Sequence, residues 1–145
     1  MNVDSLRGKF FLDTNILVYS FDPSAPAKQQ IARELIETAL SSQMGVISSQ
    51  VVQEFLNVSQ RKFARPMGVA EARRYLNGVL LPLCQHFPSI SLYDKALMLR
   101  EETGYSFYDA LIVAAAIEMG CKTLLSEDLQ DGRTIHSVTI LNPFS

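Results

Sequence analysis

The sequence has only two cysteines and two histidines in 145 residues. Cys84 and Cys121 form no CxxC pair and are too few for a disulfide framework, so we expect both thiols to be reduced. Neither His86 nor His136 belongs to a cluster of nitrogen and sulfur ligands with zinc-site spacing, which disfavours zinc. We therefore expect the two histidines to be surface or packing residues.

Long apolar runs and clustered glycines are missing as well. The longest apolar stretch, residues 110–120, is about half as long as a bilayer span, and the first ten residues lack the apolar segment of a signal peptide. The seven glycines are well separated, which excludes a Gly-rich phosphate loop and a dinucleotide fingerprint. No G-x-S-x-G nucleophile motif occurs. We expect a cytoplasmic protein that does not associate with membranes.

An excess of positive charge is also absent, because 13 basic and 15 acidic residues give a net charge of −2. This balance argues against nucleic-acid binding through overall charge. The distribution is uneven, however, since residues 59–77 contain five basic side chains and a single acidic one. This basic ridge is either a solvated helix face or a surface for phosphates. It consists of Arg61, Lys62, Arg65, Arg73 and Arg74.

The sequence does contain enough apolar material, 48% of its residues, for one domain over residues 1–145 with a substantial core. Short apolar strands are predicted at 9–13, 45–48, 122–126 and 137–143, with a loop or short strand between Pro82 and Pro88. Helices are predicted at 25–42, 50–63, 67–83, 93–102 and from Ser106 to Gly120, with Ser49 and Ser106 as N-caps and Gly104 as a C-terminal stop. This alternation predicts an α/β fold with a central parallel sheet.

Carboxylates follow the predicted strands and begin the predicted helices. Asp13 ends the first strand, and Glu54 lies about 7.5 Å along its helix at about 1.5 Å per residue. Asp109 is in the first turn after Ser106, and Glu127 and Asp128 follow a strand directly. Strand ends and helix starts meet at one edge of a parallel sheet, where open α/β folds place their sites. We expect these acids to converge.

A divalent metal ion would explain such a cluster. Asp13, Asp109 and Asp128 could each merely cap a turn or helix, but Glu54 sits mid-helix between apolar residues and has no such role. Crowded carboxylates repel and become protonated unless a hard cation such as Mg²⁺ or Mn²⁺ compensates them. With no resident nucleophile, this set suits a metal-activated water attacking a phosphodiester.

Aromatic residues adjoin one of these acids. Tyr105, Phe107 and Tyr108 lie beside Asp109, where they either stack on a base or pack in the core.

Four motifs, in this order, resemble those of PIN-domain ribonucleases, with the greatest similarity to the VapC-type toxins of toxin–antitoxin pairs. They are FLDTNILVY, VVQEFLNV, SFYDALIVAAA and LLSEDLQDG, and they cover nearly the whole chain. The resemblance implies a three-layer α/β/α domain with a parallel sheet ordered 3-2-1-4-5. It also implies Mg²⁺- or Mn²⁺-dependent endonucleolytic cleavage of single-stranded or structured RNA.

The resemblance also assigns roles to residues. It makes Asp13 and Asp109 the principal metal ligands, Glu54 a ligand or the residue that orients the attacking water, and Asp128 part of a second site. Thr14, Asn15 and Ser126 match polar positions that support these acids, and Glu127 and Asp131 are lesser candidates, Glu127 in a supporting role. It further implies a homodimer that is inhibited by an antitoxin whose tail enters the acidic groove.

Two other functions stay open on the sequence. An aspartyl-phosphate phosphoryl-transfer domain would use an acidic pair at the first strand and a later lysine, but here only Asp13 is present and Lys122 precedes its strand. A PIN scaffold that binds RNA or a protein without cutting it is the other alternative.

Overall fold

The computed structural model describes residues 3–145. Its sheet has six strands in the order β3-β2-β1-β4-β6-β5. The strands are β1 Phe10–Leu12, β2 Gly45–Ser48, β3 Cys84–His86, β4 Thr123–Leu125, β5 Thr134–Ile135 and β6 Val138–Leu141. All neighbouring strands are parallel except β5, which pairs antiparallel with β6. The predicted α/β fold is confirmed, and β6 occupies the fifth place of the order expected from the resemblance.

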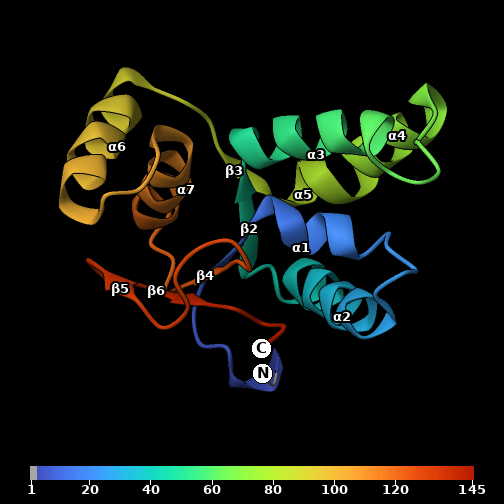
Figure 1. Ribbon diagram of the computed structural model, residues 1–145, viewed down its shortest axis with the longest axis horizontal. Helices are drawn as coiled ribbons and strands as arrows, with labels where there is room; N and C mark the ends of the chain where they lie inside the picture. The colour runs from blue at the N-terminus through green and yellow to red at the C-terminus, as the bar shows by residue number, and fades with distance from the viewer. Residues whose placement is uncertain (1–2) are drawn as a thin grey trace.

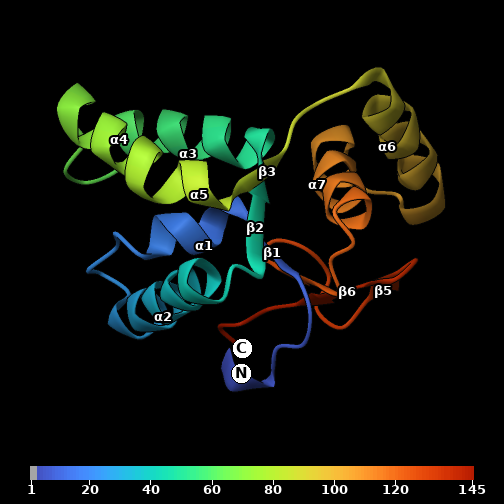
Figure 2. The ribbon, with the colours of Figure 1, turned by 180° about the vertical axis from the view of Figure 1, so that it is seen from behind.

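The helices pack in two groups around this sheet. Figures 1 and 2 show α1 to α5 on one side and the α6–α7 pair on the other, the arrangement that right-handed crossovers produce. α7 lies between α6 and the sheet, and its residues from Ala110 to Ala116 are all buried. The helical segments are η1 Val3–Ser5, α1 Thr14–Tyr19, α2 Pro26–Ser42, α3 Ser49–Arg61, α4 Val69–Tyr75, the π-helical η2 Leu76–Leu80, α5 Leu81–Leu83, α6 Ile90–Thr103 and α7 Phe107–Glu118.

Aromatic packing fixes α3 against its neighbours. The fully buried ring of Phe55 lies 4.8 Å from that of Tyr75 and 5.8 Å from that of Phe21, measured between centroids. Buried aromatic pairs stabilise beyond the area they remove from water. Because Phe55 holds one face of α3 in the core, the adjacent Glu54 is left exposed on another face.

Several predicted elements differ from the structure. The stretch after Asp13 is the helix α1, too short for its period to be recognised, and β5 has only two residues. The N-cap of α3 is Ser48 and not Ser49, because β2 runs into α3 without a loop. The predicted helix 67–83 is three consecutive segments, and its π-helical part precedes Pro82, whose missing N–H disrupts the regular ladder.

The predicted helix boundaries at Gly104 and Ser106 are confirmed. Gly104 ends α6 with a φ of 78°, and the Ser106 Oγ caps α7 by accepting from the backbone N–H of Asp109 at 3.2 Å. His86 is buried with its Nε2 2.6 Å from Glu118, whereas His136 is exposed. Cys84 and Cys121 are free. Over residues 3–145, no helix is long and apolar enough to cross a membrane.

Candidate active site

Asp13 occupies the single position between β1 and α1 and is only 8% exposed. Its Oδ1 accepts the backbone N–H of Thr14 at 2.8 Å and so caps α1. Its Oδ2 accepts the hydroxyl of Ser126, directly after β4, at 2.7 Å. The carboxylate is therefore fixed by the ends of two adjacent strands.

The electrostatic setting of Asp13 disfavours its charge. Burial raises the pKa of Asp13 to about 6, although the hydrogen bonds from Ser126 and Thr14 act to lower it. The negative charges of Glu54 and Asp128 contribute to this raised pKa, to a smaller extent than burial. No cationic side chain is among the groups that act on the pKa of Asp13 in the described part of the chain.

The residues after Asp13 hold two other acids in place. The Thr14 Oγ1 donates to Glu54 Oε2 at 3.3 Å, and the Asn15 Nδ2 donates to Asp128 Oδ2 at 3.0 Å. Asn15 also approaches the Ser126 Oγ, at 3.4 Å. The structure thus brings Asp13, Glu54 and Asp128 together through the three polar residues that the family resemblance implies as supports.

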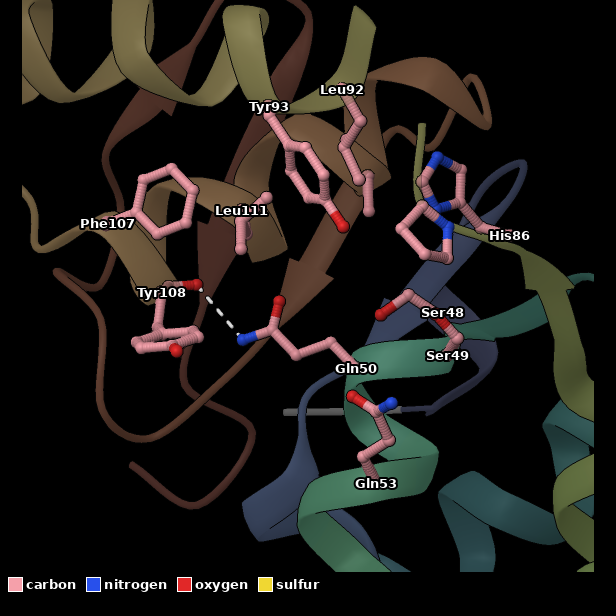
Figure 3. A pocket seen from close by; sticks show the side chains of 12 residues that line it. Ser48, Ser49, Gln50, Gln53, His86, Leu92, Tyr93, Phe107, Tyr108 and Leu111 are labelled. Atoms are coloured by element: carbon pink, nitrogen blue, oxygen red, sulfur yellow. Dashed lines mark hydrogen bonds between the residues drawn. The ribbon is translucent and has the colours of Figure 1, made fainter. Parts of the chain in front are cut away.

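Asp109 belongs to the other helical group, and it is not among the charges that act on the pKa of Asp13. It lies in the first turn of α7 and is partly exposed. Gln50 joins this turn to α3, because its Nε2 donates both to Glu54 Oε1 at 2.8 Å and to the Tyr108 carbonyl at 3.2 Å (Figure 3). Gln50 is not among the site residues predicted from the sequence, although its i,i+4 spacing to Glu54 on one helix is a usable signal.

Glu127 and Asp131 are engaged elsewhere. The Glu127 carboxylate accepts from Lys28 Nζ and from the Tyr19 hydroxyl, both at 2.6 Å. Burial alone would raise the pKa of Glu127, but these two partners hold it below its usual value. Asp131 accepts the backbone N–H of Asn142 at 2.8 Å. Glu127 supports the site only through its backbone N–H, which donates to Asn15 Oδ1 at 3.4 Å.

The basic ridge and the aromatic residues take separate positions. All five ridge side chains are exposed at the end of α3, the following turn and α4. Arg61 comes seven residues after Glu54 on α3, or about 10 Å along the axis. Phe107 and Tyr108 border a cavity next to the acids. Tyr105 instead packs under the guanidinium of Arg133, which lies 5.1 Å from its ring centroid.

Asp13, Glu54 and Asp128 offer oxygen donors of the kind that a hard divalent cation prefers. Among residues 3–145, however, no group of three Asp, Glu, His or Cys side chains is placed so that it could hold a metal ion. Mg²⁺ does not need such a group, because it usually binds one or two carboxylates and keeps several waters for substrate oxygens. A buried carboxylate whose charge burial and two neighbouring acids disfavour, with a pKa of about 6, is a suitable first ligand.

A comparison with known families decides the family. The PIN domain model matches residues 10–131. The chain belongs to the PIN-domain family. A curated relative of this PIN domain, Ribonuclease VapC7 of Mycobacterium tuberculosis, is 31% identical over 122 residues, which cover 81% of this chain and 80% of that protein.

Solved structures show the same fold. A toxin-antitoxin complex from Klebsiella pneumoniae matches with a TM-score of 0.66 at 20% identity, covering 93% of this chain and 98% of the other. VapC20 of Mycobacterium tuberculosis, described as a sarcin-ricin loop cleaving toxin, matches with a TM-score of 0.57 at 21% identity, covering 83% and 92%. At these identities the likeness concerns the fold alone.

The aspartyl-phosphate alternative does not agree with this PIN domain. Lys122 precedes β4, and its backbone N–H pairs with the carbonyl of Lys9, before the start of β1. Asp13 follows the last residue of β1, whereas Lys122 precedes the first residue of β4, so the two residues lie at opposite ends of these adjacent parallel strands. The lysine that such a mechanism requires is therefore on the wrong side.

Proposed function

We propose that this PIN domain is a metal-dependent endoribonuclease and the toxin of a toxin–antitoxin pair. The single observation that carries the proposal is the buried Asp13 carboxylate, held by Ser126 and Thr14 and facing the charges of Glu54 and Asp128, with no cationic side chain of the described residues acting on it. The 31% identity to Ribonuclease VapC7 supports RNA as the substrate.

The four acids take distinct roles in this proposal. Asp13 and Asp109 would hold Mg²⁺ or Mn²⁺, which supplies charge neutralisation and a water of lowered pKa when bound. Glu54, with one oxygen held by Gln50 and the other by Thr14, would bind the metal or orient the attacking water. Asp128, held by Asn15, would complete the site.

Thr14, Asn15 and Ser126 act as positioning residues. Each hydrogen-bonds to an acid and restricts its rotamer, which preorganises the cluster before substrate arrives. The exposed basic ridge would then bind phosphates of the RNA strand away from the cut. Its place on α3 and α4, beyond Glu54 on the same helix, supports this path.

The proposed protein partners are an antitoxin and a second copy of the chain. The structural neighbours include a toxin-antitoxin complex and a DNA-bound VapBC from Salmonella typhimurium, which support the antitoxin. Leu81, Phe87 and Ile90 are 64%, 69% and 82% exposed and supply apolar surface that a homodimer contact would cover.

The nuclease activity is tested by incubating purified protein with a pool of small RNAs. We expect cleavage with Mn²⁺ or Mg²⁺, none with EDTA, and recovery when metal is restored. An Asp109→Asn variant purified in parallel serves as the control for contaminating nucleases, and circular dichroism checks its fold. Cleavage that persists in EDTA or in Asp109→Asn would contradict the proposal. No cleavage under any metal would favour a PIN scaffold that binds without cutting.

Glu127 and Asp128 are adjacent in the sequence but are expected to differ sharply in their effect on the rate of RNA cleavage. Asp128→Asn should reduce cleavage by about 10- to 100-fold, as expected for a residue that completes a metal site. Glu127→Gln should change it by less than about threefold, because that carboxylate faces Lys28 and Tyr19 and only its backbone N–H reaches Asn15. Initial rates on one RNA at saturating metal measure both. An equal loss in the two variants would show that Asp128 has no special role.

A further inference from the structure

A cavity of about 330 Å³ opens beside the acids, between the start of α3 and the α6–α7 pair. This volume is within the range of about 300–1,000 Å³ that small-molecule sites occupy. Figure 3 shows Ser48, Ser49 and Gln50 on one side of it, facing the rings of the other helical group. None of the four acids lines this cavity.

The hydroxyl of Ser48 makes no hydrogen bond with the described residues of the fold. Ser48 is only 2% exposed, so this hydroxyl is buried. Although Ser48 is the N-cap residue of the 13-residue helix α3, its hydroxyl makes no capping bond. A buried, unsatisfied hydroxyl costs free energy and calls for an explanation. Because Ser48 lines the cavity, a bound ligand would provide the missing partner.

The opposite wall is aromatic. The Phe107 ring lies 6.5 Å from that of Tyr93 and 5.8 Å from that of Tyr108, measured between centroids. Tyr108 is 69% exposed and Tyr93 38%, so their ring faces are available to a ligand. Among the described residues, no Asp, Glu, Lys or Arg side chain lines the cavity. An uncharged planar ring with polar edges is the chemistry that this wall and the Ser48 hydroxyl match.

We propose that this cavity binds one unpaired nucleobase of the RNA, next to the phosphate that is cut. Single-stranded bases are recognised by stacking on aromatic side chains and by hydrogen bonds to their edges. Tyr93 and Tyr108 provide the stacking surface, and Ser48 and Gln50 meet the edge. This base site rests on the proposed nuclease function for its place in catalysis but not for its binding.

Gln50 connects the base site to the acids. Its side chain lines the cavity while its Nε2 bonds Glu54 Oε1, the carboxylate proposed to orient water. A strand with its phosphate at Asp13 and Asp109 therefore has an adjacent nucleoside within reach of the cavity. A base in this site would fix the register of the strand, and so the position of the cut.

The test measures nucleoside binding in EDTA, without cleavage. Adenosine, guanosine, cytidine and uridine are each titrated into isotope-labelled full-length protein and followed by NMR. We expect at least one of them to shift the ring signals of Tyr93, Phe107 and Tyr108 saturably. Ser48→Ala should weaken that nucleoside about fivefold to tenfold, the loss of one hydrogen bond. The same variant should also discriminate less between that nucleoside and the other three.

A matched control separates binding from folding. Ser59 is equally buried on α3, but its Oγ donates to the Leu56 carbonyl at 3.0 Å and it does not line the cavity. Ser59→Ala should lower the melting temperature and leave nucleoside affinity unchanged. Ser48→Ala should weaken nucleoside binding without lowering the melting temperature, because it removes a hydroxyl that has no partner in the protein.

Two results would overturn the base site. One is that none of the four nucleosides shifts the ring signals. The other is that the cavity is covered in solution by a second copy, seen as a dimer by light scattering that Tyr93→Ala dissociates. Nucleoside binding in a protein that cuts no RNA would keep the base site and reject the nuclease. Cleavage without nucleoside binding would do the reverse.

Discussion

An Asp13→Asn variant is expected to lose RNA cleavage by more than about 100-fold and to remain folded. Even residues that only contact metal ligands cost about 10- to 100-fold when they are removed, and Asp13 is proposed as a ligand itself. Asparagine caps helices as well as aspartate does, so α1 keeps its first hydrogen bond from Thr14. The substitution therefore removes the charge and alters one hydrogen bond, the one from Ser126, because the amide Nδ2 cannot accept its hydroxyl. Initial rates of cleavage at saturating Mn²⁺, with circular dichroism of both proteins, measure the effect.

The matched control for this prediction is Asp22→Asn. Asp22 also caps a local turn, where its Oδ1 accepts the backbone N–H of Ser24 at 3.0 Å. It lies outside the acidic cluster, so Asp22→Asn should cleave at the rate of the unmodified protein. Cleavage by Asp13→Asn within tenfold of that rate would show that its carboxylate does not hold the metal. The nuclease proposal would then have to rest on the other acids.

The second large effect is on stability, which should fall as pH rises when no metal is present. The pKa of Asp13 is about 6 in the folded protein against 3.8 as its ordinary value. Between these values the folded state binds the proton more tightly than the unfolded state. Its contribution to stability is therefore complete below about pH 4 and is lost as pH rises through 6. At about 1.36 kcal/mol per pKa unit, the loss is on the order of 3 kcal/mol.

Urea unfolding in EDTA at pH values from 4 to 7.5 measures this loss. Subtracting the profile of Asp13→Asn, which cannot titrate there, removes the contributions of the other acids. We expect the variant to be the more stable protein at pH 7.5, with the difference vanishing near pH 4. Mg²⁺ or Mn²⁺ should restore stability to the unmodified protein but not to the variant. Parallel profiles for both proteins would mean that Asp13 titrates normally.

Much of this fold was predictable because its signals are local. Continuous apolar strands, the Ser106 cap and the Gly104 stop each depend on a few adjacent residues, and they appear as expected. The convergence of Asp13, Glu54 and Asp128 followed from one topological rule for parallel sheets. The resemblance to PIN domains added the strand order, which local patterns do not determine.

The parts that escaped prediction depend on contacts between distant segments. Gln50 matters because Tyr108, 58 positions away, comes to lie beside it. Glu127 directly follows a strand in the sequence, as a site residue would, but its carboxylate accepts hydrogen bonds from Lys28 and Tyr19. Nothing in the sequence marks Ser48 as unpartnered, since that depends on the distant segments that enclose it.

Two of the strand–helix junctions near the acids have almost no connecting residues. β1 leads into α1 through Asp13 alone, and β2 leads directly into α3. One residue inserted at the β2–α3 junction would rotate Glu54 by about 100° around its helix, since about 3.6 residues complete a turn. We therefore expect insertions to be tolerated better elsewhere, such as in the turn between α3 and α4. The acidic cluster can stay constant while changes in those longer connections alter which RNA strands reach it.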